Sequence, residues 1–544
     1  MTLFLTFVLS MMVTLILIPP FMKSATFLKI VDIPDDERKI HKGKIPRIGG
    51  LAMIIGVILP VYTLLSNQDE IIFLYAGLLT LLVFGVLDDR FQLNYKFKFL
   101  GQFLAILAVV LFGSVVIYKM PLLSDDLLPS YFAVPFTIFA MLGVTNAINL
   151  SDGLDGLAGG MSLLSLSGIA LMAYNVENTV VLLLCIAVLG SILGFLRYNT
   201  FPARVFMGDT GSQFLGFTLG LAVILLTQHE GAMISTSVSL FLLGVPVLDT
   251  ITVMAKRISG GRSPFSPDNN HIHHRLLAIG FHHHEAVLII YIVQAMMVMA
   301  GYVLQYQSDY LILSSYLIVC TIIIGTLYIT KKNNWLVHSG NIRGETSFFE
   351  RNLHWLGNRS RLLMILLIAT GMILGILFLS AVSFAERLPY DSLIMASIMG
   401  GVFFCLFIFR SRRHISWLER IVIYTLGAMV IFIIQGHTSL PAEIVQYQDM
   451  LFALLVVAVI LGFRYSAVKT FEPTPLDFLV ILAAIISAVL PEIQFISKEL
   501  GLNMTRLIIL FYALEFVLVH VSQRLDILRY GVFIALGILG FNGI

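Results

Sequence analysis

Charge is scarce in this 544-residue sequence: Asp, Glu, Lys and Arg make up only 12% of it, whereas hydrophobic residues make up 58%. This imbalance excludes an ordinary water-soluble protein, because so much apolar surface cannot be buried in a soluble core. Cysteine is scarcer still. Cys185, Cys320 and Cys405 all lie in apolar runs, so neither a disulfide scaffold nor a cysteine-rich metal site is expected.

Long apolar runs predict an all-α polytopic membrane protein. A spanning helix needs roughly 20 mostly apolar residues, and about eleven candidates lie near 2–20, 48–66, 70–87, 99–118, 131–146, 158–174, 179–196, 212–228, 233–255, 285–305 and 310–330. About seven more lie near 361–383, 389–409, 420–436, 448–463, 476–490, 504–520 and 527–543. We expect a first membrane domain, 1–330, a basic cytoplasmic linker, 331–360, and a C-terminal transmembrane domain of unknown role, 361–544.

The N-terminal apolar segment lacks the basic n-region and the small-residue cleavage site of a signal peptide, so we expect a retained helix whose N-terminus lies outside. In that orientation 30 of the 34 Lys and Arg residues fall in inner loops, and the outer loops keep Lys119, Arg387, Lys498 and Arg506. Basic residues favour cytoplasmic loops. The distribution predicts a multi-pass membrane protein, with the motifs below on the cytoplasmic side.

A polar stretch between two apolar runs, residues 146–160, is the centre of the first domain. Asn146, Asn149, Asp152 and Asp155 recur at every third position, so on a helix or a tight helical turn they would project onto neighbouring faces. Acids beside membrane segments are costly unless they are used or paired. We interpret the stretch as the floor of an active site; a polar loop between two helices is the alternative.

Two adjacent acids, Asp88 and Asp89, follow the third apolar segment on the same inner side. Carboxylates this close repel each other unless a cation or a proton intervenes. The pair therefore indicates a metal site or a general base. The alternative is an ion pair with Arg90, Lys96 or Lys98.

A third group follows the seventh segment, where Met-Gly-Asp-Thr-Gly-Ser occupies positions 207–212. Asp209 offers a hard oxygen ligand, and the helix start beside it offers backbone donors for a phosphate. A simple N-cap is the competing interpretation of Asp209. Arg47, at the inner end of the second segment, is a candidate phosphate contact because a guanidinium presents a fixed fork of donors; lipid contact is its alternative.

Three histidines, His271, His273 and His274, complete the set. Zinc is not expected, because no cysteine or HExxH helix accompanies them and the nearby acids suit a hard cation. We interpret the histidines as donors to phosphate or sugar oxygens. Alternating topology places all these motifs on one face, where Mg²⁺, with Mn²⁺ as an alternative, would need one or two carboxylates plus phosphates and water. This chemistry suggests phosphoryl transfer from a nucleotide to a membrane lipid.

The motifs PRIGG, LDDRFQL, NAINLSDGLDGLAGG, FMGDTGS and HIHHRLL resemble, in order and spacing, those of the polyprenyl-phosphate N-acetylhexosamine-1-phosphate transferases over about residues 1–330. The resemblance implies transfer of a sugar phosphate from UDP-N-acetylhexosamine to undecaprenyl phosphate with release of UMP, the first membrane step of a cell-envelope polysaccharide or teichoic-acid pathway. HIHHRLL resembles the N-acetylglucosamine branch, so UDP-GlcNAc is the expected donor. The resemblance also implies the bacterial plasma membrane as the location. The expected partners are these substrates and the lipid bilayer, without nucleic acid; a homodimer is an open expectation.

Carried over residue by residue, the resemblance makes Asp209 the chief magnesium ligand and adds Asp152 to the metal surroundings. Asp88 and Asp89 would act at the lipid phosphate, one of them as its base, and with Asp152 and Asp155 they form the expected catalytic set. The expected substrate-binding residues are Arg47, Lys98, Asn146, Asn149, Arg204, His271, His273 and His274.

The sequence departs from the family pattern in two places. Gln92 stands where some members have a third acid, and ordinary members lack the C-terminal half. A secondary transporter that uses intramembrane acids is the main alternative function, and a non-catalytic scaffold is another. The acids cluster at inner helix ends rather than at paired broken helices near the midplane, which favours the enzyme.

Overall fold

The computed structural model describes residues 2–32, 44–65, 72–123, 127–229, 234–263, 270–333, 359–383 and 442–465, and scattered positions within 423–427 and 506–520. The chain divides into two compact units, Met1–Gly340 with Thr474–Leu476, and Asn341–Pro473 with Asp477–Ile544. Among the described residues, ten helices are long and apolar enough to cross a membrane, or up to eleven if one bent pair counts as a span. The predicted all-α polytopic membrane fold is confirmed.

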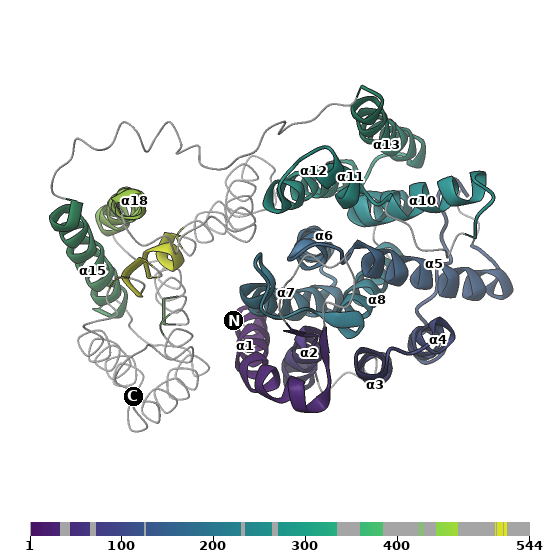
Figure 1. Ribbon diagram of the computed structural model, residues 1–544, viewed down its shortest axis with the longest axis horizontal. Coiled ribbons are helices and arrows are strands. Elements are labelled where there is room, and N and C mark those ends of the chain that lie inside the picture. Colours follow the sequence, from purple (N-terminus) through teal and green to yellow (C-terminus); the bar gives the residue numbers. More distant parts are fainter. Residues whose placement is uncertain are drawn as a thin grey trace. The chain divides into compact units, whose positions relative to one another are not determined.

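Figure 1 shows the helices of the first unit in purple to green. They are α1 (Thr2–Leu28), α2 (Gly49–Leu65), α3 (Ile72–Phe91), α4 (Tyr95–Phe112), α5 (Ser130–Ser151), α6 (Leu157–Asn175), α7 (Thr179–Asn199), α8 (Gly208–Thr227), α9 (Ser239–Leu242), α10 (Gly244–Ser259), α11 (Ile272–Ala278), α12 (His283–Leu304) and α13 (Asp309–Lys332). A 3₁₀ turn, η2 (Thr236–Val238), precedes α9. Before α2, the strands β1 (Val31–Asp32) and β2 (Ile45–Pro46) pair antiparallel.

Helix α8 lies at the centre of the first unit and packs against α2, α3, α5 and α6. Nearly all of its side chains are buried. Its neighbours approach closely: a Cβ added at Gly50 would lie 2.2 Å from the nitrogen of Gly211, and one at Gly216 would lie 2.6 Å from Thr145 Cα. Such close backbone packing holds membrane helices together where lipid is as apolar as the side chains. The motif at the start of α8 therefore sits on a rigid element.

The structure corrects three predicted helix ends and one predicted helix. The first helix continues past 20 to Leu28, the fourth ends at Phe112 instead of 118, and α5 continues past 146 to Ser151. The ninth span, predicted as one helix over 233–255, is instead broken: the segments Thr236–Leu242 and Gly244–Ser259 meet at 86°. The apolar composition on both sides of the break does not reveal this bend. Pro246 marks it in the sequence, because proline has no backbone N–H to donate to the carbonyl of Leu242.

A buried amide from α12 stabilises the break. Gln294 Oε1 accepts a hydrogen bond from the nitrogen of Val245 at 2.9 Å, and its Nε2 donates to the carbonyl of Leu242 at 3.2 Å. Both backbone groups lie where the helical ladder is interrupted, and an unsatisfied group inside a bilayer costs several kcal/mol. Gln294 therefore replaces hydrogen bonds that a straight helix would make.

In the second unit, α15 (Arg359–Ser383) packs against α18 (Ala442–Tyr465). Their shared core includes Leu377, Phe452 and Leu455. The predicted spans near 389–409, 476–490 and 527–543 lie outside the described residues, and those near 420–436 and 504–520 are described only in part. The seven-helix prediction for this half stays a prediction.

Candidate active site

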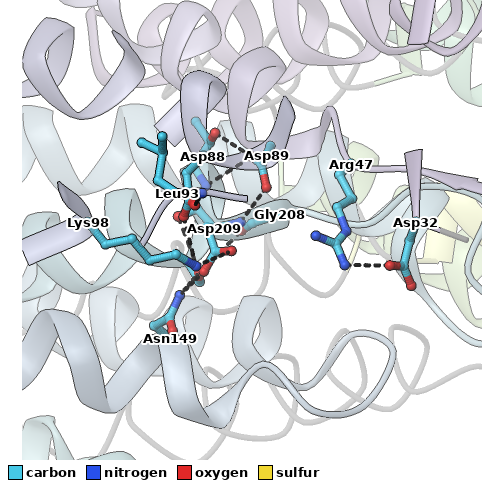
Figure 2. Close-up of polar contacts among 11 residues, drawn as sticks. Asp32, Arg47, Asp88, Asp89, Leu93, Lys98, Asn149, Gly208 and Asp209 are labelled. Atoms are coloured by element: carbon cyan, nitrogen blue, oxygen red, sulfur yellow. Dashed lines mark hydrogen bonds and ion pairs between the residues drawn. The ribbon is translucent and has the colours of Figure 1, made fainter. Parts of the chain in front are cut away.

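A lysine joins two of the predicted acids. Lys98 Nζ, on α4, lies 2.9 Å from Asp88 Oδ2 near the end of α3 and 3.1 Å from Asp209 Oδ2 at the start of α8 (Figure 2). The alternative raised for Asp88, an ion pair with Lys98, is therefore present, but the same ammonium also reaches a second acid. Asp88 is buried, whereas a quarter of the Asp209 side chain is exposed. Two carboxylates from different helices thus converge on one cation that solvent can reach.

The carboxamide of Asn149, on α5, fixes the other oxygen of Asp209. Its Nδ2 donates to Asp209 Oδ1 at 2.9 Å and to Ser212 Oγ at 2.7 Å. Asp209 therefore has one oxygen held by an amide and the other by an ammonium, which orients its carboxylate. Among the described residues, no contact joins Asn146 to this cluster, and its predicted substrate contact stays a prediction.

Asp89 has different partners from its neighbour. Its carboxylate accepts hydrogen bonds from the nitrogen of Asp209 at 2.8 Å, the nitrogen of Thr210 at 3.2 Å and Thr210 Oγ1 at 2.5 Å. All three donors belong to the first turn of α8. Asp88 instead accepts from the nitrogen of Leu93 at 2.9 Å and pairs with Lys98.

Asp152 and Asp155 lie on the turn between α5 and α6. The pKa of Asp152 is raised by the protein packed around it and by the nearby charges of Asp209, Asp155 and Asp89. Asp155 Oδ2 accepts from the nitrogen of Ala203 at 2.9 Å. The turn is thus held in place beside the Asp209 cluster.

The two predicted arginines differ in position. Arg47 forms an ion pair with Asp32 of β1, to one side of the carboxylate cluster in Figure 2. Its charge still lowers the pKa of Asp152, so a guanidinium lies within electrostatic range of the turn. Arg204 is exposed, and the described contacts do not bring its side chain to the cluster.

The histidine motif packs on the same turn through His273. A Cβ added at Gly153 would lie 2.2 Å from His273 Nε2, so only glycine admits the ring there. Burial, with the neighbouring histidines, lowers the pKa of His273 to about 3, and the pKa of His274 is also lowered. At neutral pH His273 can therefore offer a hydrogen bond but no charge.

His271 has a carboxylate partner that sequence reasoning left without a role. Asp249, buried on α10, lies 2.8 Å from His271 Nδ1 through Oδ2 and accepts from the nitrogen of Ile272 through Oδ1, also at 2.8 Å. It fixes the His271 ring and caps α11. Asp249 and His271 are 22 positions apart in the sequence, and no local sequence pattern predicts their contact.

Other contributing residues also escaped sequence reasoning. Asn199 Oδ1 accepts a hydrogen bond from the nitrogen of Gly156 at 3.0 Å, and the Tyr291 hydroxyl donates to the carbonyl of Gly156 at 2.7 Å. Both side chains come from helices distant in the chain, α7 and α12. They hold the turn that carries Asp152 and Asp155, and neither lies in a recognisable motif.

The donor set bears on the expected magnesium ion. Across the part of the chain that the structure describes, no three His, Cys, Asp or Glu side chains are grouped so as to hold a metal. Magnesium needs fewer protein ligands, because phosphates and water complete its shell. Asp88 and Asp209 already hold one ammonium between them. A divalent ion bound jointly with substrate would need carboxylate oxygens of Asp209 that now face Lys98 and Asn149.

Known proteins resemble the half of the chain that contains this site. Residues 71–227 match glycosyl transferase family 4. The probable undecaprenyl-phosphate N-acetylglucosaminyl 1-phosphate transferase of Bacillus subtilis (strain 168) is 38% identical over 289 residues, 53% of this chain and 80% of that protein. The undecaprenyl-phosphate alpha-N-acetylglucosaminyl 1-phosphate transferase of Yersinia pestis is 33% identical, over 51% of this chain and 78% of that protein. The enzyme of the same name from Escherichia coli (strain K12) is 31% identical, over 52% of this chain and 79% of that protein.

Proposed function

This chain belongs to the polyprenyl-phosphate N-acetylhexosamine-1-phosphate transferase family, and from that premise we propose that it transfers N-acetylglucosamine 1-phosphate from UDP-N-acetylglucosamine to undecaprenyl phosphate, releasing UMP. The names of its relatives support the acceptor and the sugar phosphate. The convergence of Asp88 and Asp209 on Lys98 carries the proposal, because it gathers charges suited to phosphoryl transfer. Transport is not favoured, since these relatives are transferases.

The transfer exchanges one phosphorus–oxygen bond for another. An oxygen of the lipid phosphate becomes bonded to the β-phosphorus of the donor, and the bridging oxygen leaves with UMP. Both substrates are anionic and the site is rich in carboxylates, so repulsion opposes their approach unless cations compensate. Lys98 supplies one positive charge at the centre, and Arg47 supplies another near Asp152.

The side chains of the cluster divide the work. Asp88, beside Lys98, is the acid that we assign to the lipid phosphate, where it would accept a proton. Asn149 and Lys98 orient Asp209, which with Asp152 would hold Mg²⁺ or Mn²⁺. When bound, that ion would neutralise the donor's diphosphate and the departing UMP. Asp152 and Asp155, on their fixed turn, would line the nucleotide side.

We place the site on the cytoplasmic face of the plasma membrane, with the N-terminus outside. The distribution of Lys and Arg supports this orientation. UDP-sugars are cytoplasmic, so a cytoplasmic site would meet its donor directly. The product lipid would then enter a pathway that builds a cell-envelope polysaccharide or teichoic acid.

Isotope tracing tests the proposal. The full-length protein, in nanodiscs with undecaprenyl phosphate and Mg²⁺, receives UDP-GlcNAc labelled with ³²P at either the α or the β position. We expect the β label in the lipid extract and the α label in UMP, with neither transfer when the lipid acceptor is omitted. Folded protein that moves the sugar without the β label, or that labels no lipid, would refute it. UDP-GalNAc in parallel reports the sugar preference.

A further inference from the structure

The two acids of the Asp88–Asp89 pair point to different structures. The Asp88 carboxylate faces Lys98, whereas the Asp89 carboxylate faces the backbone and hydroxyl donors at the start of α8 (Figure 2). Adjacent residues on a helix are separated by about 100°, so such a division is natural. The pair is therefore not one functional unit.

Asp89 accepts hydrogen bonds from the backbone at the start of α8, a role that a capping residue next to the same helix usually has. The first N–H groups of a helix have no partner inside it, and those that are buried need another acceptor. Met207, at the N-cap position of α8, makes no side-chain cap. Asp89 instead reaches across from α3 and accepts from the nitrogens of Asp209 and Thr210. This is a helix cap supplied by a neighbouring helix.

The backbone around Asp89 is shaped to admit its carboxylate. Gly208 has φ +68°, and a Cβ there would lie 2.5 Å from both carboxylate oxygens of Asp89. One helical turn before Asp89, a Cβ at Gly85 would lie 2.7 Å from Thr210 Cα. With Asp89 only 5% exposed, α3 and the first turn of α8 form one closely packed unit.

We infer that Asp89 and Thr210 are positioning residues that clamp the first turn of α8 to α3, so that Asp209 meets Lys98 and Asn149, while Asp88 is the member of the pair that faces the reacting groups. The Thr210 hydroxyl, 2.5 Å from Asp89 Oδ2, completes the clamp. The kinetic part of this inference rests on the proposed transferase function. The structural part does not.

Hydrogen–deuterium exchange tests the clamp without any substrate. In the full-length protein in nanodiscs, Asp89→Asn keeps the side-chain volume but removes the charge and one acceptor oxygen. Amides at the start of α8 should then exchange at least about tenfold faster, since bonds to a carboxylate are the stronger kind. The matched variant Asp88→Asn should leave that exchange within about twofold of the wild type. Equal exchange in the two variants would overturn the clamp.

Threonine variants on α8 test the consequence for turnover. Thr210→Val removes the hydroxyl and keeps the branched shape, whereas Thr210→Ser keeps the hydroxyl. Thr218→Val is the matched control, because the buried Thr218 hydroxyl donates only within α8, to the carbonyls of Phe214 and Leu215. We expect Thr210→Val to lower kcat for UMP release at least about tenfold with KM for UDP-GlcNAc within about twofold, as the loss of a charge-assisted bond predicts.

The conservative variant separates positioning from general damage. Thr210→Ser should restore kcat to within about threefold of the wild type, and Thr218→Val should remain near it. A Thr210→Val protein as active as Thr218→Val, or a Thr210→Ser protein as impaired as Thr210→Val, would overturn the role of the hydroxyl. If the wild type releases no UMP, the transferase proposal fails and the exchange experiment alone decides the clamp.

Discussion

Gly208 gives the sharpest test of how the site is built, because substitution there meets both backbone strain and a carboxylate. Its φ of +68° lies in the left-handed region, and the methyl group of Gly208→Ala would lie 2.5 Å from each Asp89 oxygen. The Asp89 carboxylate would have to move away from α8. Gly261 provides a matched control: it also has φ +68°, and a Cβ there meets nothing within 4 Å.

The new methyl group displaces the Asp89 carboxylate in Gly208→Ala and no neighbouring atom in Gly261→Ala. Left-handed backbone costs an alanine roughly 1–2 kcal/mol at either position. At Gly208, moving the carboxylate also breaks one or two of its three hydrogen bonds, each worth about 1.5–3 kcal/mol because the acceptor is charged. Gly208→Ala should therefore be less stable than Gly261→Ala by about 1.5–6 kcal/mol.

Thermal denaturation in detergent and UMP release measure the difference. We expect Gly208→Ala to denature at least about 2 °C below Gly261→Ala and to lose its activity, with Gly261→Ala close to the wild type in turnover. Equal denaturation midpoints and equal turnover would show that Asp89 is not held against Gly208, and the description of the α3–α8 junction would be wrong.

Two further predictions concern side chains near Asp209 and on the histidine motif. Asn149→Ala removes the amide that holds Asp209 and should lower UMP release at least about tenfold. Ser212→Ala removes the second acceptor of that amide and a hydroxyl that donates to the carbonyls of Gly208 and Asp209 but leaves the Asn149–Asp209 bond in place, so it should cost less; the reverse order would contradict this role. The pKa of His273 is about 3 in the folded protein and about 6.5 in the unfolded protein. Between these two pH values the unfolded state binds more protons than the folded state. The free energy of unfolding therefore decreases as the pH falls below 6.5, by about 2 kcal/mol at pH 5. Denaturation midpoints at pH 7.5 and 5.0 should therefore differ less for His273→Gln than for the wild type, and identical differences would contradict the buried neutral ring.

Apolar runs were enough to predict the helices of the first unit, because a bilayer leaves the backbone few other structures. They could not predict the break at Leu242–Gly244, since the hydrogen bonds that permit it come from Gln294 on another helix. Nor could they predict that α5 would continue to Ser151, because the membrane sets a helix's apolar length and not the point where its backbone stops being helical.

The sequence likewise predicted some features of the site but not its long-range contacts. Polar residues in apolar surroundings identified Asp88, Asn149 and Asp209 as candidates, and the structure brings them together around Lys98. The different partners of Asp88 and Asp89 depend on the packing of α3 against α8, which adjacent letters in a sequence do not encode. The pairing of Asp249 with His271 likewise depends on a long-range contact.

The most direct test of the central claim is UMP release by full-length wild-type and Asp209→Asn proteins in nanodiscs, with undecaprenyl phosphate, Mg²⁺ and UDP-GlcNAc each omitted in turn. We expect the wild type to release UMP only when all three are present, and folded Asp209→Asn to release none. Release by Asp209→Asn at the wild-type rate, or no release by folded wild type under any condition, would contradict the assignment of this carboxylate cluster as a phosphoryl-transfer site.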